Sequence, residues 1–272
     1  MQEGQNCIIS GMIRAVCCVP VSPLRAEASH RSEMVSQQLF GECCEVLEQG
    51  EDGWTLIRCS YDGYEGWCTA GHLTEIDDPD YEQGSNALTP EWVSEIEYNG
   101  HPMMLPLGSA LTGMRNGHAS WRKNKLHYKG KAWDPAAAQR DARTIRQLAY
   151  KFLNTPYLWG GKTVFGVDCS GFTQTVLKFF NVPLLRDAWQ QATQGEPVGF
   201  LEEVRTGDLA FFDNEEGRIT HVGILLNDHE VIHASVKVRV DKIDHMGIVH
   251  AENFQRTHRL RVIKRVMATA AK

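Results

Sequence analysis

The first quarter of the chain alternates apolar and polar positions in short segments separated by turn residues. The segments IRAVCCVPV, EMVSQQLFGECCEVLEQ, WTLIRCS and YEGWCTA have the strand-like pattern of one buried and one solvated face. A glycine turn at residues 50–53 follows the second segment, and Tyr61-Asp62-Gly63 between the last two is typical of a β-hairpin. Short strands at this regular spacing predict a small β-barrel over residues 1–77.

A polar, acidic stretch, IDDPDYEQGSN at residues 76–86, follows this barrel and has the composition of a linker. Beyond it the extended pieces WVSEIEY, HPMMLPLGSAL and KLHYKGKAW alternate with glycine turns. They predict a second, more divergent barrel over residues 78–134, although the two units show no obvious sequence repeat.

The pattern changes at Pro135, where helical spacing replaces strand-like alternation. The segment AAAQRDARTIRQLAYKFL carries apolar residues on one helical face, and Asn154-Thr155-Pro156 ends it. A second helix and two strand-like segments, HVGILL and EVIHAS, follow. We therefore expect an α+β domain over residues 135–272.

Charge and hydropathy exclude two classes of partner. The net charge is −6 and the pI is near 6.0, and the basic residues close to the C-terminus are interleaved with apolar ones. That pattern favours a strand with a solvated face over a nucleic-acid contact. No apolar run approaches the roughly 20 residues of a membrane-spanning helix. The start MQEGQNC lacks the basic and apolar regions of an export signal, so a cytoplasmic protein and an exported protein supplied without its leader both stay open.

The cysteines are unevenly distributed, with seven of the eight in the first quarter of the chain. These seven form no CxxC pair and have no histidines at zinc-finger spacing, so no structural metal site is predicted. Because they lie in strand-like segments, we expect buried free thiols rather than disulfides. The seven are Cys7, Cys17, Cys18, Cys43, Cys44, Cys59 and Cys68.

The remaining cysteine, Cys169, stands between Asp168 and an apolar series at helical spacing. Phe172, Val176 and Phe179 continue that series. Asp168 is a candidate N-cap, which places Cys169 in the first turn. The helix N-terminus favours a thiolate, so we expect the pKa of this cysteine to be lowered, with unpaired amides nearby to receive an oxyanion. A buried cysteine at a helix start would show the same local pattern.

Several ordered motifs resolve that ambiguity through resemblance. PYLWGG, DCSGF, GDLAFF, THVGILL and VIHAS follow one another over about 130 residues, and this series resembles the NlpC/P60 peptidase domain. Near the N-terminus, SPLR, LFGE, a DGW turn and YEGW resemble a bacterial SH3 (SH3b) domain. The resemblance implies a papain-like α+β cysteine peptidase domain preceded by two SH3b-like barrels. That combination is similar to the γ-D-glutamyl-L-diamino acid endopeptidases, the dipeptidyl-peptidase VI type.

Two histidines lie on the consecutive strand-like segments HVGILL and EVIHAS. If Asn227, Asp228 and His229 form the loop, residue 223 pairs with 233, and His221 and His233 become diagonal neighbours on one face. A two-residue turn would instead place them on opposite faces. In the implied mechanism Cys169 is the nucleophile, His221 is its base, and His233 orients that base.

The resemblance also implies substrate-binding residues. Tyr157 and Trp159 lie on a glycine-bounded loop expected to line the cleft, and Tyr157 would help to bind the oxyanion. An unfilled carboxylate at Asp168 would pair with a substrate amine. The first SH3b unit would close one end of the cleft and select a short peptide with a free N-terminal L-Ala. The expected substrate contacts are Glu33, Tyr64, Tyr157, Trp159, Asp168, Ser170 and Asp187.

The implied reaction is hydrolysis of the γ-D-Glu–diamino acid bond in peptidoglycan stem peptides, through an acyl-thioester at Cys169 and without a metal or organic cofactor. Two alternatives stay open at this point. One is a wall-lytic endopeptidase that acts on intact peptidoglycan, and the other is a non-catalytic protein that binds wall peptide. A thiol redox protein is disfavoured because the N-terminal cysteines form no CxxC pair.

Overall fold

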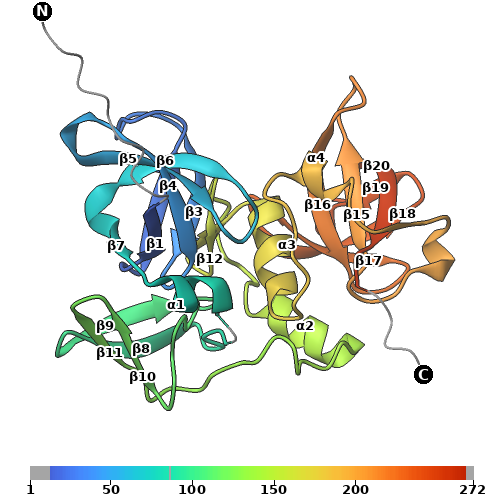
Figure 1. The fold of residues 1–272 in the computed structure, drawn as a ribbon. Helices are drawn as coiled ribbons and strands as arrows, with labels where there is room; N and C mark the ends of the chain where they lie inside the picture. The colour runs from blue at the N-terminus through green and yellow to red at the C-terminus, as the bar shows by residue number, and fades with distance from the viewer. Residues whose placement is uncertain (1–12, 86, 268–272) are drawn as a thin grey trace, which may run out of the picture.

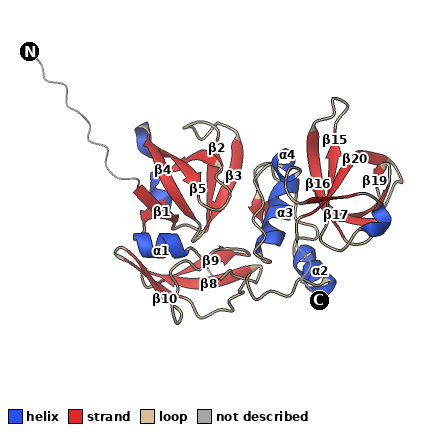
Figure 2. Ribbon diagram, turned by 45° about the vertical axis from the view of Figure 1, so that its right-hand side comes forward, coloured by secondary structure: helices blue, strands red, loops and turns tan. Residues whose placement is uncertain are grey.

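The computed structural model describes residues 13–85 and 87–267, which form three units rich in β-strands. Figure 1 shows two sheet units at the N-terminal side, one above the other, and a third unit beside them. The helix that carries Cys169 lies between the first unit and the C-terminal sheet in both views (Figures 1 and 2). Strands far outnumber helices, and the predicted α+β class is confirmed.

The first unit is one antiparallel sheet in the order β3-β2-β6-β5-β4-β1-β7. Its hairpin β5–β6 turns at Tyr61–Gly63 as predicted, with Arg58 paired to Glu65. The strands are β1 (Ile13–Cys17), β2 (Val21–Arg25), β3 (Met34–Leu39), β4 (Cys43–Gln49), β5 (Trp54–Cys59), β6 (Glu65–Thr69) and β7 (Leu73–Glu75), with short 3-10 turns at Glu51–Gly53 and Ala70–His72.

One segment that the sequence presents as a single strand is divided in the structure. EMVSQQLFGECCEVLEQ breaks between β3 and β4 at Gly41, whose φ of +77° favours glycine. A side chain at Gly41 would also meet the carbonyl oxygen of Ala110 at 1.8 Å. The turn at Gly41 therefore both reverses the chain and allows the second unit to approach closely.

The second unit is a four-stranded antiparallel sheet in the order β10-β11-β8-β9. It packs on the first unit, since one hydrophobic cluster contains Val16 and Phe40 together with Ile96 and Trp121. The polar stretch predicted as a linker contains a short helix, α1, which Pro79 helps to start. The bounds are α1 (Asp78–Gln83), β8 (Val93–Tyr98), β9 (His101–Pro106), β10 (His118–Trp121) and β11 (Asn124–His127).

The third unit packs helices α2 and α3 against a seven-stranded sheet in the order β14-β20-β15-β16-β17-β18-β19. Because β19 also pairs with β20, six of these strands close on themselves. The bounds are α2 (Ala142–Tyr150), β12 (Lys162–Thr163), β13 (Gly166–Val167), α3 (Cys169–Lys178), α4 (Ala188–Gln191), β14 (Glu196–Val198), the 3-10 turn Leu201–Glu203, β15 (Leu209–Asp213), β16 (Ile219–Leu225), β17 (Glu230–Ser235), β18 (Lys237–Asp244), β19 (Gly247–Val249) and β20 (Arg256–Arg265).

Helix α2 begins later than the predicted segment because Asp141 caps it. The Asp141 carboxylate accepts a hydrogen bond from the amide of Thr144 at 2.7 Å. The residues that precede Asp141 in that segment are therefore not helical. Ile145, Leu148 and Ala149 are buried, as the amphipathic pattern predicts.

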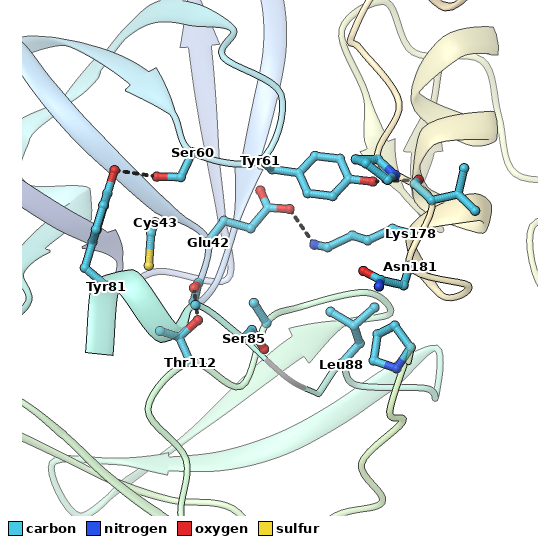
Figure 3. A pocket seen from close by; sticks show the side chains of 16 residues that line it. Glu42, Cys43, Ser60, Tyr61, Tyr81, Ser85, Leu88, Thr112, Lys178 and Asn181 are labelled. Carbon is cyan, nitrogen blue, oxygen red and sulfur yellow. Dashed lines mark hydrogen bonds and ion pairs between the residues drawn. The ribbon is translucent and has the colours of Figure 1, made fainter. Parts of the chain in front are cut away.

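A buried ion cluster joins the first unit to helix α3. Glu42 Oε1 lies 2.6 Å from the ammonium of Lys178, and Glu42 Oε2 lies 3.5 Å from that of Lys162. Figure 3 shows Glu42 and Lys178 facing each other, with the Tyr61 ring beside them. The Tyr61 hydroxyl donates to the carbonyl of Val182 at 3.3 Å. These contacts fix the first unit against the element that carries Cys169.

The described cysteines are free thiols. Five of the six in the first unit are buried and Cys18 is half-buried, while the prediction for Cys7 lies outside the described residues. Burial raises the pKa of each of these six thiols. They behave as small apolar core residues.

Candidate active site

Cys169 is the first residue of helix α3. The Asp168 carboxylate accepts a hydrogen bond from the Gly171 amide at 2.6 Å, so Asp168 is the N-cap that the sequence predicts. Phe172, Val176 and Phe179 are fully buried and hold the helix on the sheet. The first amides of a helix lack intrahelical acceptors, so the Cys169 amide points out of the helix beside its own sulfur.

The sulfur of Cys169 is deeply placed, with the residue only 6% exposed. Burial, together with a smaller effect of the neighbouring Asp168 carboxylate, raises the pKa of the Cys169 thiol to about 12. Hydrogen bonds from the backbone amides of Val222 and Ser170 lower the pKa, but their effect is smaller than that of burial. The expectation that the helix N-terminus lowers this pKa is therefore wrong, and the sulfur is a thiol in the resting site.

The hairpin β16–β17 brings His221 and His233 together. Gly223 pairs with His233 and Leu225 with Val231, so the loop is centred on residue 228. This register confirms the three-residue loop and excludes the two-residue turn. His221 Nε2 lies 2.8 Å from His233 Nδ1. The Val222 amide that approaches the Cys169 sulfur belongs to the residue next to His221.

Both imidazoles are neutral near pH 7. Burial, followed by the neighbouring His233, holds the pKa of His221 well below 6.5. Burial also lowers the pKa of His233, although its hydrogen bond to a carboxylate opposes that change. A neutral imidazole has a free lone pair, so it can accept a thiol proton during a reaction.

Sequence reasoning missed two residues of this cluster. Asp241 on β18 accepts a hydrogen bond from the other ring nitrogen of His233, with 3.0 Å between Oδ2 and Nε2. His258 on β20 stacks on His221, with 4.2 Å between ring centroids, and burial lowers its pKa to about 4. These neighbours become visible only in the sheet, where β18 pairs with β17 and β20 pairs with β15 and β19.

A cavity of about 460 Å³ opens between the first unit and the third unit beside Cys169. All seven predicted substrate contacts line it, although they come from two units and several loops. Five further residues complete the wall, namely Val35, Ala188, Trp189, Ile219 and Thr220. Glu33, Val35 and Tyr64 bring the first unit to one side of this cavity.

Glu33 and Trp159 meet across the boundary between the units. The Trp159 indole N–H donates to Glu33 Oε1 at 2.6 Å, and the Trp159 side chain stays 59% exposed. The partner of this carboxylate is a neutral group, so its negative charge is not compensated there. Asp187, the N-cap of α4, is another cavity carboxylate; burial raises its pKa, although the charge of the neighbouring Arg186 opposes that rise.

Asp168 differs from these two carboxylates. The guanidinium of Arg186 contacts both of its oxygens, with Nη2 2.6 Å from Oδ2 and Nη1 3.1 Å from Oδ1. The Gly160 amide also donates to Oδ2 at 2.9 Å. The prediction of an unfilled carboxylate at Asp168 is therefore wrong, because Arg186, which sequence reasoning missed, already neutralises it.

Two tyrosines face the same cavity. Burial, together with a smaller effect of Asp187, raises the pKa of Tyr64 to about 12. Burial likewise raises the pKa of Tyr157, and the neighbouring Cys169 contributes. Both hydroxyls therefore stay protonated and can donate hydrogen bonds. Ser170 donates to Asp168 at 3.3 Å and accepts from Arg186 at 2.9 Å.

The cavity lining carries three carboxylates and no lysine or arginine. With Asp168 compensated by Arg186, two negative charges remain for a cationic ligand. Within residues 13–85 and 87–267, no group of three or more His, Cys, Asp or Glu side chains is arranged to hold a metal ion. Over the same residues, no helix has the length and apolar character needed to cross a membrane.

Two family models match separate parts of the chain. The NlpC/P60 family model matches residues 154–256, and the model of the bacterial dipeptidyl-peptidase Sh3 domain matches residues 24–73. The first match contains Cys169, His221 and His233, and the second contains Glu33 and Tyr64. The predicted arrangement of a papain-like domain preceded by an SH3-like β-rich region is confirmed.

Individual proteins resemble the chain over most of its length or over its third unit. A gamma-D-glutamyl-L-lysine dipeptidyl-peptidase of Bacillus cereus is 28% identical over 236 residues, which cover 76% of this chain and 68% of that protein. A probable endopeptidase NlpC of Escherichia coli is 36% identical over 136 residues, covering 48% of this chain and 88% of that protein. The crystal structure of an NlpC/P60 family protein from Bacillus cereus covers 94% of this chain and 100% of its own with a TM-score of 0.76 at 18% identity, so the fold is shared.

Proposed function

The chain belongs to the NlpC/P60 family of cysteine peptidases, and from that premise we propose that it hydrolyses the γ-D-Glu–diamino acid bond of peptidoglycan stem peptides with a free N-terminal L-Ala. The similar protein from Bacillus cereus is named for the γ-D-glutamyl-L-lysine bond. One observation carries the proposal: a single cavity joins Cys169 to uncompensated carboxylates, one of which the SH3-like unit supplies.

The chemical step begins from a neutral pair, because Cys169 is a thiol and His221 is a neutral imidazole. As the sulfur attacks the γ-carbonyl carbon, its proton passes to His221. The C–N bond then breaks, His221 returns that proton to the leaving amine, and an acyl-thioester remains on Cys169. Water, deprotonated by His221, hydrolyses the thioester and restores the thiol. His233 holds the ring of His221 throughout.

The oxyanion formed in each half of this reaction needs hydrogen-bond donors. The amide of Cys169 at the start of α3 is one candidate, since helix N-termini favour negative charge. The Tyr157 hydroxyl is the other, because it lines the cavity beside Cys169 and stays protonated. Both donors exist before substrate binds, so little reorganisation is needed.

The free amino group of the substrate is expected to bind at Glu33 and Asp187, with the Tyr64 hydroxyl beside them. An ammonium ion compensates the charge of these carboxylates, whereas an acylated nitrogen is neutral and leaves that charge without a counter-ion. Asp168 and Ser170 act indirectly, because Arg186 already occupies the Asp168 carboxylate. They shape the cavity floor next to Cys169.

The position of the first unit limits the length of the substrate on its amino side. Val35 and Tyr64 form part of the wall there, and the Glu33–Trp159 hydrogen bond crosses the boundary. A peptide whose amino end continues into glycan or another residue would meet this wall. We therefore expect short free peptides to be cleaved in preference to intact wall.

Mass spectrometry of three substrates tests the proposal. Purified protein is incubated with L-Ala-γ-D-Glu-diaminopimelate, with the same peptide N-acetylated, and with intact sacculi. We expect release of diaminopimelate from the first substrate, at least about 100-fold slower release from the second, consistent with the loss of a charge-paired hydrogen bond and a steric clash, and none from the third. Equal rates on the free and acetylated peptides would contradict amine recognition, and rapid solubilisation of sacculi would favour a wall-lytic enzyme.

A further inference from the structure

Three neighbouring strands place three polar side chains in a diagonal row on one face of the C-terminal sheet. His233 on β17 pairs in register with Gly223 on β16 and with Arg239 on β18. His221 and Asp241 each lie two residues from those partners, and therefore on the same face as His233. Hydrogen bonds link the three side chains, with 2.8 Å between the two histidines and 3.0 Å between His233 and Asp241.

Asp241 is a carboxylate rather than a carboxylic acid. It is almost fully buried, and burial alone would favour the neutral acid. Hydrogen bonds from His233, Arg239 and the Ala251 amide nevertheless hold its pKa well below its usual range. Arg239 Nη2 and the Ala251 amide lie 2.9 and 2.8 Å from Oδ1, which leaves Oδ2 for His233. An ionised carboxylate has no hydrogen to donate, so it can only accept a hydrogen bond from that ring.

This fixes the position of every proton along the row. His233 Nε2 must carry the hydrogen that Asp241 accepts, so in the neutral ring His233 Nδ1 carries none. The hydrogen in the 2.8 Å contact then belongs to His221 Nε2. In a neutral His221 the other nitrogen, Nδ1, has a free lone pair, which is what a base for Cys169 needs.

We propose that Asp241 is a positioning residue that fixes the tautomer of His221 through His233, so that Nδ1 of His221 is the unprotonated nitrogen available to Cys169. The carboxylate also stabilises the positive charge that His221 acquires when it takes the thiol proton. The inference rests on the proposed function only in assigning His221 as the base.

Substitution of Asp241 by Asn reverses the donor and acceptor of each hydrogen bond along the row. The side-chain oxygen of Asn can still accept from Arg239 and Ala251, while its NH₂ group faces His233 and donates. His233 Nε2 then becomes the acceptor, Nδ1 carries the hydrogen, and His221 is protonated on Nδ1. We expect kcat on L-Ala-γ-D-Glu-diaminopimelate to fall at least about 100-fold with little change in KM.

The matched control is Asp208→Asn. Asp208 is equally buried and paired with arginine, but it accepts its hydrogen bonds from Arg205 and Arg265 rather than from a histidine. We expect its kcat to stay within about threefold of the wild type, since no proton relay is changed. In a His233→Gln background the Asp241→Asn substitution is also expected to change kcat by less than about threefold, because no ring remains to transmit the effect. A purely structural role would give equal losses in both backgrounds.

Nitrogen-15 NMR of the histidine rings tests the tautomers directly and needs no substrate. We expect hydrogen on Nε2 of both His221 and His233 in the wild type, and on Nδ1 of both in Asp241→Asn. Wild-type His221 protonated on Nδ1 would overturn the inference even if the variant did not fold. An Asp241→Asn protein with unchanged tautomers and near wild-type kcat would overturn it as well. The predicted tautomers in a protein that cleaves no stem peptide would instead contradict the proposed function.

Discussion

Glu42 in the first, SH3-like unit lies 2.6 Å from the ammonium of Lys178, the last residue of helix α3. The two residues are 136 positions apart, and the side chains of Glu42 and Lys178 are only 6% and 11% exposed. Lys162 approaches the same carboxylate at 3.5 Å. The contact determines where the first unit lies, and therefore where Glu33 and Tyr64 enter the cavity.

Replacement of Glu42 by Gln should strongly destabilise the protein. The substitution leaves two buried ammonium groups without their counter-charge, which we expect to cost about 3 kcal/mol in the free energy of unfolding. Urea denaturation of both proteins measures this difference. As a control, Glu65→Gln removes an exposed ion pair with Arg58 and should change stability by less than about 0.5 kcal/mol.

The difference in the free energy of unfolding between wild type and Glu42→Gln should also depend on pH. The pKa of Glu42 falls from 4.5 to about 2 in the folded protein, because the attraction of Lys162 and Lys178 outweighs the opposing effect of burial. A lowered folded pKa contributes stability above pH 4.5, and that contribution is lost as the pH falls towards 2. A difference that stayed constant over this range would show that the charge of Glu42 is not responsible.

Glu33→Gln should selectively weaken the binding of peptides with a free amino group. Glutamine keeps an oxygen to accept the Trp159 indole N–H but removes the negative charge. We expect KM for L-Ala-γ-D-Glu-diaminopimelate to rise about tenfold, and the preference over the N-acetyl peptide to shrink by the same factor. Steady-state kinetics on both peptides measure this. The exposed Glu27→Gln should leave both constants unchanged, and an equal loss on both peptides would argue against a contact with the amine.

The acid limb of the kcat/KM profile should lie at a lower pH than it would with a histidine of ordinary pKa. Because the pKa of His221 lies well below 6.5, the base stays neutral until the pH falls through that lowered value, so the acid limb is expected below pH 6.5. The alkaline limb should lie at about pH 8, where the substrate amino group loses its charge. The N-acetyl peptide should lack that limb. An acid limb at or above pH 6.5 would contradict the buried, neutral His221.

Val236 offers a test of backbone strain at the tip of the β17–β18 hairpin. Its φ of +63° lies in the left-handed region, which a β-branched residue rarely adopts, and its side chain is 83% exposed. Its carbonyl nevertheless holds the Tyr157 amide at 2.8 Å. Val236→Asn should therefore raise stability by about 1 kcal/mol, as measured by urea denaturation. Phe200→Asn, at an exposed residue whose φ is −134°, is the control.

Local patterns in the sequence were enough to predict the elements that carry the candidate catalytic residues. The Asp168 cap, the apolar face of α3 and the loop centred on residue 228 each depend on spacings of only a few residues. The Asp168–Arg186 and His233–Asp241 pairs could not be predicted in this way, because they depend on how separate loops and strands pack. The pKa of Cys169 was mispredicted for a related reason. The helix N-terminus is visible in the sequence, whereas the burial that outweighs it requires the sheet and the neighbouring units.

The most direct test of the central claim compares wild-type protein with Cys169→Ala on L-Ala-γ-D-Glu-diaminopimelate, with products identified by mass spectrometry. We predict that the wild type releases diaminopimelate and the dipeptide L-Ala-γ-D-Glu. The variant should fold with unchanged thermal stability and lose at least about 1,000-fold in kcat/KM, because the nucleophile is absent. Turnover by Cys169→Ala within about tenfold of the wild type, or cleavage of a different bond by the wild type, would contradict the account.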